Sequence, residues 1–266
     1  MVYLHAIFGN MESSAVFTQQ FDIQSHHIGP DFEVSLQYLL GCMQTTADLH
    51  VDSHRLGWKD LHAKGCFWAI YRMGLRINRL PRKYDHITVR TWANPPQGIF
   101  QPRSFEVVDQ QGDVYLYAQS LWIILDDKTF QPITIESVMD TDVVSLLGGD
   151  HSFPIPLKVP LAKGETVFPA VTRNVLYSDI DTNLHVNNTV YARWVLDSIP
   201  AEFLQSHRLS EMILNYVQQA HLGDTYDVAM TSMSEGRIAT TISRHGGDGA
   251  DFCKIVTRWE ERKPEC

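Results

Sequence analysis

The chain has 266 residues, a formal net charge of −9, 44% hydrophobic residues and 20% charged residues. This length allows one large domain or two smaller ones with a real buried core, and the negative charge argues against a general nucleic-acid-binding protein. No apolar run is long enough to span a membrane as a helix, and the N-terminal residues lack the basic start of a signal peptide.

Strand and helix patterns follow one another through the first half of the chain. Residues 17–23 alternate as a strand, and a helix beginning near Asp31 is predicted to run to about Leu49, with apolar side chains on one face. Four more strands are predicted, over residues 67–77, 86–92, 100–108 and 114–125, and a turn signal at 109–113 joins the last two.

A different composition follows at residues 126–169. Prolines recur through this stretch, and Gly148 and Gly149 stand in its middle. Such punctuation is typical of a connecting segment, here with one short helix expected near Val138 to Leu147.

The order of elements then repeats. Residues 171–177 are predicted as a strand, a polar loop follows, and residues 189–199 are predicted as a helix. Four strands are expected after it, over residues 209–219, 226–233, 237–243 and 252–259. Two copies of strand, helix and four strands indicate a duplicated α+β unit, in which a helix packs on an antiparallel sheet. We expect a first repeat over 1–135, a linker over 136–169 and a second repeat over 170–262, with the two sheets joined edge to edge.

The polar loop before the second helix carries the candidate chemistry. It delivers Asp181, Asn183 and His185 to the start of the helix, where Asn187 or Asn188 is a natural N-cap. An acid, an amide and an imidazole beside backbone N–H groups are the parts needed to attack a carbonyl with water. The alternative is that these are ordinary turn and capping residues. The first copy lacks this pattern at the corresponding place, so we expect one half to carry chemistry and the other to shape a pocket.

These residues resemble a known family, the fatty acyl-ACP thioesterases of plants and their bacterial relatives. The matching segments are Asp181-Thr182-Asn183-Leu184-His185-Val186-Asn187-Asn188, then Tyr191-Ala192-Arg193-Trp194, and in the first half Pro81-Arg82, Thr91-Trp92 and Ser120-Leu121-Trp122. The resemblance runs from about Phe17 to Trp259. It implies a tandem double hotdog fold, each repeat a long helix packed on a curved antiparallel sheet.

The resemblance also implies an activity: hydrolysis of the thioester of long-chain acyl-ACP, which releases free fatty acid in fatty acid biosynthesis. Separately from the resemblance, the spacing of the four cysteines is that of reduced thiols and predicts a cytoplasmic protein. By that resemblance His185 would polarise the carbonyl or activate water. Asn183 would orient the carbonyl or the water, and Asp181 would position either neighbour. The partner implied is an acyl carrier protein bearing an acyl chain, and no cofactor is implied.

One position departs from the family pattern. Gln219 stands where the family has a glutamate, and Ala220 stands where plant members have a cysteine. A glutamine can hydrogen-bond a water but cannot take its proton. The predicted catalytic set is therefore Asp181, Asn183, His185 and Gln219, and the candidate bases are His185, Asp181 and His221.

Several alternatives are open at this stage. The chain could act on acyl-CoA instead of acyl-ACP, or could be a non-catalytic acyl-binding module. Basic residues that cluster in sequence could meet the acidic carrier protein or could form a solvated strand edge; they are Arg72, Arg76, Arg79, Arg82 and Lys83. The four cysteines have no metal-ligand spacing, which predicts reduced thiols and no zinc site. The oligomeric state, monomer or homodimer, is open as well.

Overall fold

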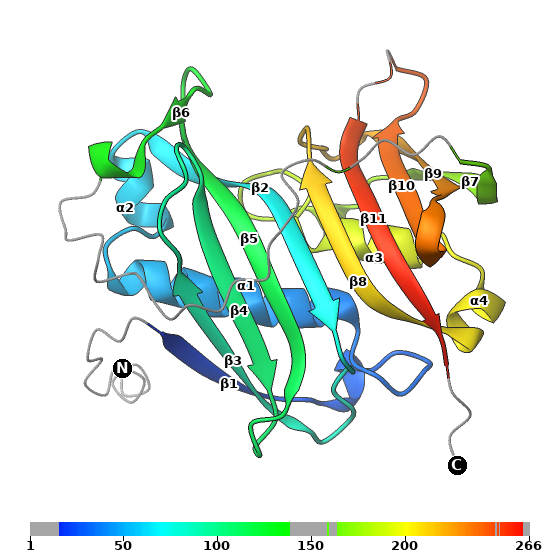
Figure 1. Cartoon of the computed structure of the whole chain (residues 1–266). Coiled ribbons are helices and arrows are strands. Elements are labelled where there is room, and N and C mark those ends of the chain that lie inside the picture. Colours follow the sequence, from blue (N-terminus) through cyan, green and yellow to red (C-terminus); the bar gives the residue numbers. More distant parts are fainter. Residues whose placement is uncertain (1–15, 139–158, 160–163, 248, 250, 263–266) are drawn as a thin grey trace.

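The computed structural model describes residues 16–138, 159, 164–247, 249 and 251–262. An 11-stranded sheet dominates it (Figure 1). The strands are β1 (Phe17–Asp22), β2 (Cys66–Ile77), β3 (His86–Ala93), β4 (Gln101–Val108), β5 (Val114–Asp126), β6 (Pro132–Ile133), β7 (Thr166–Asn174), β8 (His207–Tyr216), β9 (Thr225–Ser232), β10 (Arg237–Arg244) and β11 (Asp251–Glu261). The helices are α1 (Leu36–Ser53), α2 (Trp58–Ala63), α3 (Val190–Leu196) and α4 (Ala201–Ser206), with short 3-10 turns η1 (Ser25–His27), η2 (Ile135–Ser137), η4 (Tyr177–Asp179) and η5 (Ser234–Gly236).

The strand order shows that the chain is built twice. It runs β1-β3-β4-β5-β2-β8-β11-β10-β9-β7, with β6 paired to β5. The first five strands in this order have the same relative arrangement as the last five read from the other end. The halves meet where β2 pairs antiparallel with β8, from Arg72 opposite Asn215 to Arg76 opposite Glu211. The predicted duplication and the edge-to-edge joining of the two sheets are confirmed.

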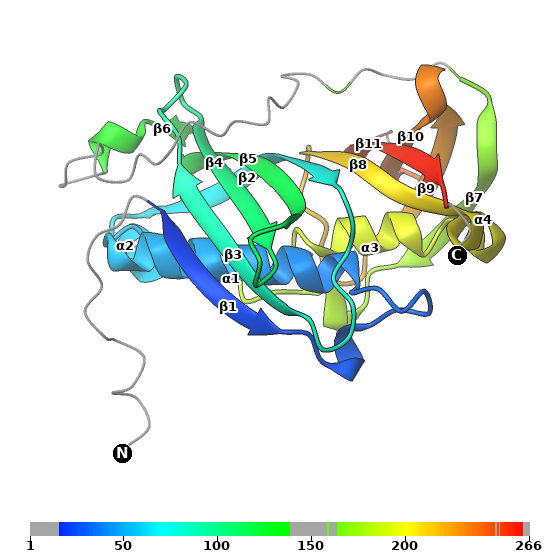
Figure 2. The same ribbon diagram turned by 60° about the horizontal axis from the view of Figure 1, so that its bottom comes forward.

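Both repeats place a helix on the same face of the sheet (Figure 2). Ser35 begins α1 by accepting a hydrogen bond from the Tyr38 N–H at 3.3 Å, as expected of a serine N-cap. The buried face of α1, which includes Leu39 and Met43, joins Trp194 of α3 in one apolar cluster that extends through both repeats. This is the tandem double hotdog predicted from the sequence, with one core shared by the two halves.

The second helix is shorter than predicted. It ends at Leu196 after 7 residues, whereas a helix to Ile199 was expected. The N–H groups of Ser198 and Ile199 donate to carbonyls only three residues back, and Pro200, which has no N–H and disfavours a helical residue before it, begins α4. The expectation of a long helix in each repeat is therefore wrong for the second repeat.

Other boundaries differ on a smaller scale. Tyr177, predicted to end a strand, lies in η4, because β7 already ends at Asn174. β7 begins at Thr166, inside the stretch predicted as a linker, and most of that stretch lies outside the described residues. The helix expected near Val138 to Leu147 also falls outside them, apart from Val138. The division into 1–135, 136–169 and 170–262 stays a prediction.

The loop that precedes the helix has the same backbone in both repeats. Isolated antiparallel bridges join Ile28 to Val34 in the first and Ile180 to Val186 in the second. Phe32 and Leu184 occupy the same place in the two loops, and both have positive φ, 59° and 63°. Left-handed backbone is costly for residues other than glycine, so its occurrence at both tips shows that closing the loop imposes it.

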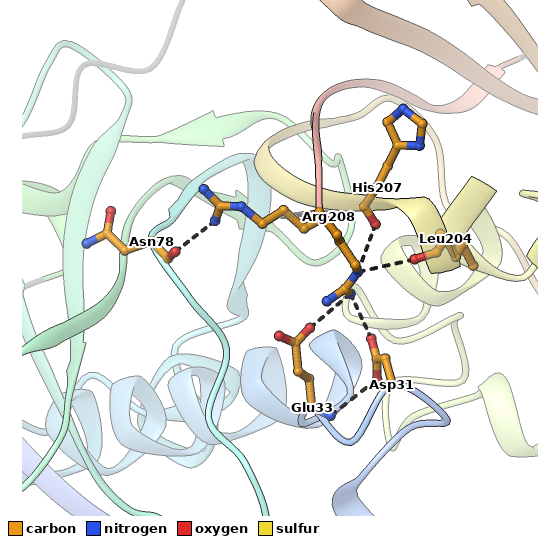
Figure 3. Close-up of polar contacts among 7 residues, drawn as sticks. Asp31, Glu33, Asn78, Leu204, His207 and Arg208 are labelled. Atoms are coloured by element: carbon orange, nitrogen blue, oxygen red, sulfur yellow. Dashed lines mark hydrogen bonds and ion pairs between the residues drawn. The ribbon is translucent and has the colours of Figure 1, made fainter. Parts of the chain in front are cut away.

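Arg262, after β11, ties the second repeat to the first loop. Its Nη2 lies 3.2 Å from Asp31 Oδ2 and 3.1 Å from Glu33 Oε2. Its Nε donates to the carbonyls of Leu204 and His207, at 3.4 and 3.2 Å. Figure 3 shows these acceptors gathered between the blue loop and the yellow strand start. The first-repeat loop is thus held in an ion-pair network.

Candidate active site

Three of the four predicted catalytic residues, Asp181, Asn183 and His185, lie on a closed loop between β7 and α3. The turn η4 leads into the loop, and the bridge between Ile180 and Val186 closes it. Inside that bridge the Asp181 N–H donates to the His185 carbonyl at 2.9 Å. The backbone therefore fixes the three predicted residues relative to one another.

The Asp181 carboxylate organises this loop and sets part of its electrostatics. Its Oδ1 accepts a hydrogen bond from the Asn183 N–H at 2.8 Å, the local pattern by which aspartate stabilises turns. Burial lowers the pKa of His185, the neighbouring His221 lowers it further, and Asp181 opposes both. His185 is therefore a neutral imidazole at neutral pH, with one nitrogen able to accept a proton and one N–H able to donate a hydrogen bond.

Asn183 is contacted from the other repeat. Trp58, the first residue of α2, donates its Nε1–H to Asn183 Oδ1 at 3.3 Å, and its ring stacks on His62 with centroids 4.9 Å apart. The chain reaches this position through Gly57, where an added Cβ would lie 1.6 Å from Asp52 Oδ1. Any side chain there would force the Asp52 side chain to move, so glycine at this position eases the close approach of α2 to α1.

Gln219 and its neighbours lie on the loop after β8. The Ala220 carbonyl accepts a hydrogen bond from the Val186 N–H at 2.9 Å, which pairs the two loops. His221 comes next, and its ring meets that of His185 edge-on, with centroids 4.9 Å apart. The Gln219 side chain is exposed and has no hydrogen bond to a described residue. The structure thus brings Asp181, Asn183 and His185 together and adds His221, but shows no contact from Gln219 to them.

The junction of the loop with α3 is also fixed by side chains. Asn187 Oδ1 accepts hydrogen bonds from the N–H and the hydroxyl of Thr189, at 2.9 and 2.7 Å. The N-cap of α3 is Thr189 and not Asn187 or Asn188 as predicted, so Asn187 orders the turn just before the helix. Asp179, only 1% exposed, pairs with Arg193 of α3 and accepts the Leu176 N–H at 2.9 Å. Because a buried carboxylate needs such partners, this pair anchors the loop to the helix.

An open groove of about 680 Å³ borders the loop. One wall is the side of α1 between Ser35 and Asp48, and the other is formed by residues of η4, Asp181 and the start of α3. Tyr38 and Cys42 lie on the α1 wall. The groove is mixed in polarity and runs between the two repeats, so a ligand bound in it would contact both.

Family models match both halves of the chain. The model of the acyl-ACP thioesterase N-terminal domain matches residues 14–141, and that of the C-terminal domain matches residues 167–261. The chain belongs to the acyl-ACP thioesterase family.

Curated members of the acyl-ACP thioesterase family match over almost the whole chain. A palmitoyl-acyl carrier protein thioesterase of Gossypium hirsutum is 26% identical over 95% of this chain and 65% of its own length. Oleoyl-acyl carrier protein thioesterase 2 of Arabidopsis thaliana is 24% identical over 89% of this chain and 68% of its own length. This chain therefore spans about two thirds of the length of these two relatives.

Solved structures of acyl-ACP thioesterases share the fold. One from Bacteroides thetaiotaomicron superposes with a TM-score of 0.83 at 23% identity, covering 92% of this chain and 98% of that one. The 12:0-ACP thioesterase of Umbellularia californica also gives 0.83, at 21% identity, covering 96% of this chain and all of that one. Both agree with the arrangement of strands and helices found here.

Two residues of this site were missed from the sequence. Trp58 was not singled out, because α2 is only 6 residues long and too short for a periodic pattern. The Gly57-Trp58 pair was a signal, since an isolated glycine often marks a close backbone approach. Asp179 was not singled out, because nothing in its local sequence shows that Arg193 lies beside it.

Proposed function

We propose that this chain is a thioester hydrolase that cleaves long-chain acyl-ACP and releases free fatty acid in fatty acid biosynthesis. The observation that carries the proposal is the closed loop that holds Asp181, Asn183 and His185 together at the edge of an open groove. Family membership supports the same reaction, and relatives named palmitoyl- and oleoyl-acyl carrier protein thioesterases support a long acyl chain.

Hydrolysis needs a water, a proton acceptor and a donor to the carbonyl oxygen. The water oxygen forms a bond to the thioester carbon, one water proton passes to an imidazole, the C–S bond breaks and the departing sulfur takes the proton. His185 can serve as that acceptor or can donate its N–H to the carbonyl oxygen. Asn183 orients the carbonyl or the water through its amide, and Asp181 holds both in place.

The groove supports a substrate that extends between the repeats. Its α1 wall belongs to the first repeat and its Asp181 wall to the second. The part of the substrate that carries the thioester could lie along α1, with the thioester carbon near the Asp181 loop. A pocket shaped by one repeat and catalytic groups supplied by the other is the division of labour expected from the sequence.

The basic residues that cluster in sequence do not by themselves identify the carrier. Arg72 is 2% exposed and donates to Asn215 Oδ1. Arg76 lies 3.5 Å from Glu211, and Arg79 lies 2.6 Å from Asp109, although both side chains stay about half exposed. Because three of the five pair with groups of the same chain, acyl-ACP is preferred here over acyl-CoA because of family membership and not because of this cluster.

The test is direct assay of both carriers. We expect the full chain to release free thiol and fatty acid from palmitoyl-ACP with a higher kcat/KM than from palmitoyl-CoA. The His185→Ala variant should lose about two to four orders of magnitude in kcat, the usual scale for an acid–base group, while keeping its circular dichroism spectrum. A better rate on palmitoyl-CoA would favour the acyl-CoA thioesterase, and acyl binding without turnover would favour the binding module.

We further propose a cytoplasmic location and no nucleic-acid partner. Sedimentation by analytical ultracentrifugation distinguishes a monomer from a homodimer. Cys42, Cys66 and Cys253 are buried free thiols, as is common in a reducing compartment. Among the described residues no helix is both long and apolar enough to cross a membrane, and no group of three or more His, Cys, Asp or Glu side chains could hold a metal ion. Cell fractionation with a specific antibody tests the location.

A further inference from the structure

The backbone pairing of two loops places His221, and not Gln219, directly opposite His185. In the first repeat the Val34 N–H donates to the Pro81 carbonyl at 2.8 Å, and Glu33 is bridged to Arg82. In the second repeat the Val186 N–H donates in the same way to Ala220, so the positions that correspond to Glu33 and Arg82 are His185 and His221. Opposed residues of an antiparallel pair have neighbouring side chains, and the ring separation of 4.9 Å agrees.

Asp224 and solvent surround His221. The backbone N–H of His221 donates to Asp224 Oδ2 at 2.9 Å, and the ring Nδ1 lies 4.0 Å from the same oxygen. At that distance a carboxylate offsets the positive charge of an imidazolium. Asp224 also pairs with Arg244 at 3.0 Å, which holds the carboxylate in place. The His221 side chain is 52% exposed, so it can exchange protons with water.

His185 has the complementary surroundings. Burial and the proximity of His221 lower the pKa of His185, against the opposing effect of Asp181. A neutral His185 can donate a ring N–H to a carbonyl oxygen. The exposed His221 ring beside it presents a second imidazole to a bound water.

We propose that His221 is a catalytic residue of this thioesterase and works as its general base, with His185 as the donor to the carbonyl oxygen. The inference rests on the proposed hydrolysis of an acyl thioester. His221 accepts one proton from the water as the water oxygen bonds to the thioester carbon. When the C–S bond breaks, the imidazolium returns this proton to the sulfur, and the carboxylic acid loses its remaining proton to solvent.

The experiment compares His221→Ala with His86→Ala in the full chain, on palmitoyl-ACP. His86 is a matched control: it is 55% exposed and its Nδ1 pairs with Asp22 at 2.5 Å in the first repeat. We expect His221→Ala to lose about a hundredfold or more in kcat with little change in KM, and added imidazole to restore part of the lost kcat. His86→Ala should keep the wild-type kcat. Unchanged thermal unfolding of both variants shows that the fold is intact.

Two outcomes overturn the inference. His221→Ala with kcat within about threefold of wild type would leave His185 to act alone as the base, and a loss that imidazole does not restore would make His221 a structural residue. In both cases an active wild-type enzyme leaves the proposed function standing. A wild-type chain that releases no thiol from palmitoyl-ACP or palmitoyl-CoA would instead refute the proposed function.

Discussion

Asn183 accepts a hydrogen bond from a residue far away in sequence, and this contact sets how its amide points. Trp58 Nε1 donates to the Asn183 carbonyl oxygen, so the Asn183 NH₂ group is directed elsewhere. An amide held in one orientation can bind a carbonyl or a water without first being ordered. Trp58 is thus a positioning residue contributed by the half of the molecule that has no catalytic loop.

Trp58→Phe removes this donor and keeps an aromatic ring over His62. We expect kcat to fall about fivefold, the scale of one neutral hydrogen bond, and KM to change little. Steady-state kinetics on palmitoyl-ACP measure both. Trp122→Phe, which removes a hydrogen bond to Ser120 Oγ, is the control and should keep wild-type kcat; equal losses in both variants would contradict a specific role for Trp58.

Gln219→Glu tests whether a carboxylate is missing from the site. The Gln219 side chain is exposed and makes no hydrogen bond to a described residue, and the new charge would add to the negative charge of Asp181. We expect kcat at pH 7 to be unchanged or lower, because a carboxylate near another one is disfavoured. The measurement is kcat against pH for wild type and variant. A tenfold gain in kcat would mean that the wild-type chain lacks a carboxylate base at position 219.

Elements were predicted well where side chains alternate and poorly where they do not. Most strands of both repeats were found within a few residues, because period-two burial shows in strands such as β8 and β10. The two-residue strand β6 was not predicted, and β7 begins five residues before its predicted start. The short helices α2 and α4 were missed, and the end of α3 was placed too late, since one or two turns give too little periodicity. At the site, the motif around His185 was recognised and His221 was named among the candidate bases, but Trp58 and Asp179 were not singled out. The contact of Trp58 with Asn183 and the position of His221 opposite His185 depend on packing and strand register, which the local sequence does not contain.

Arg262 offers a test of how the end of β11 stabilises the first-repeat loop. Arg262→Ala removes hydrogen bonds to two carboxylates and two carbonyls. The side chain is 28% exposed, so we expect the free energy of unfolding to fall by only about 1–2 kcal/mol. Urea denaturation measures it. Arg90→Ala, which breaks a surface pair with Glu106, should cost less than about 0.5 kcal/mol; a similar loss in both would contradict the network.

At the scale of the whole molecule, the buried His50 makes stability depend on pH. His50 is 0% exposed and its Nδ1 accepts a hydrogen bond from Arg103 at 3.0 Å. Burial, the Arg103 charge and His54 lower the pKa of His50 to about 3, whereas an unfolded histidine titrates near 6.5. Between these two values the unfolded chain binds more protons, so the free energy of unfolding falls as the pH falls through that window.

His50→Gln should reduce this acid sensitivity. A difference of one bound proton between the folded and the unfolded chain changes the free energy of unfolding by about 1.4 kcal/mol per pH unit. Burial raises the pKa of Asp48 to about 6. This shift opposes the His50 effect at pH values between the raised pKa of Asp48 and the ordinary pKa of a carboxyl group. The comparison of variant with wild type isolates the histidine. Urea denaturation at pH 7.5 and 5 is the measurement, and His86→Gln is the exposed control. Equal pH dependence in wild type and His50→Gln would contradict the prediction.

Because the two loops match, new catalytic side chains could be introduced into the first-repeat loop by protein engineering. The loop around Glu33 already has the backbone of the loop around His185, including the same bridge and the same positive φ at its tip. Replacing Glu33 and Arg82 with histidines would therefore change side chains on a backbone that already has the required conformation. Arg262 would have to be replaced as well, because it forms an ion pair with Glu33. A duplicated fold of this kind offers a second reaction centre that could be tuned for another acyl length without disturbing the first.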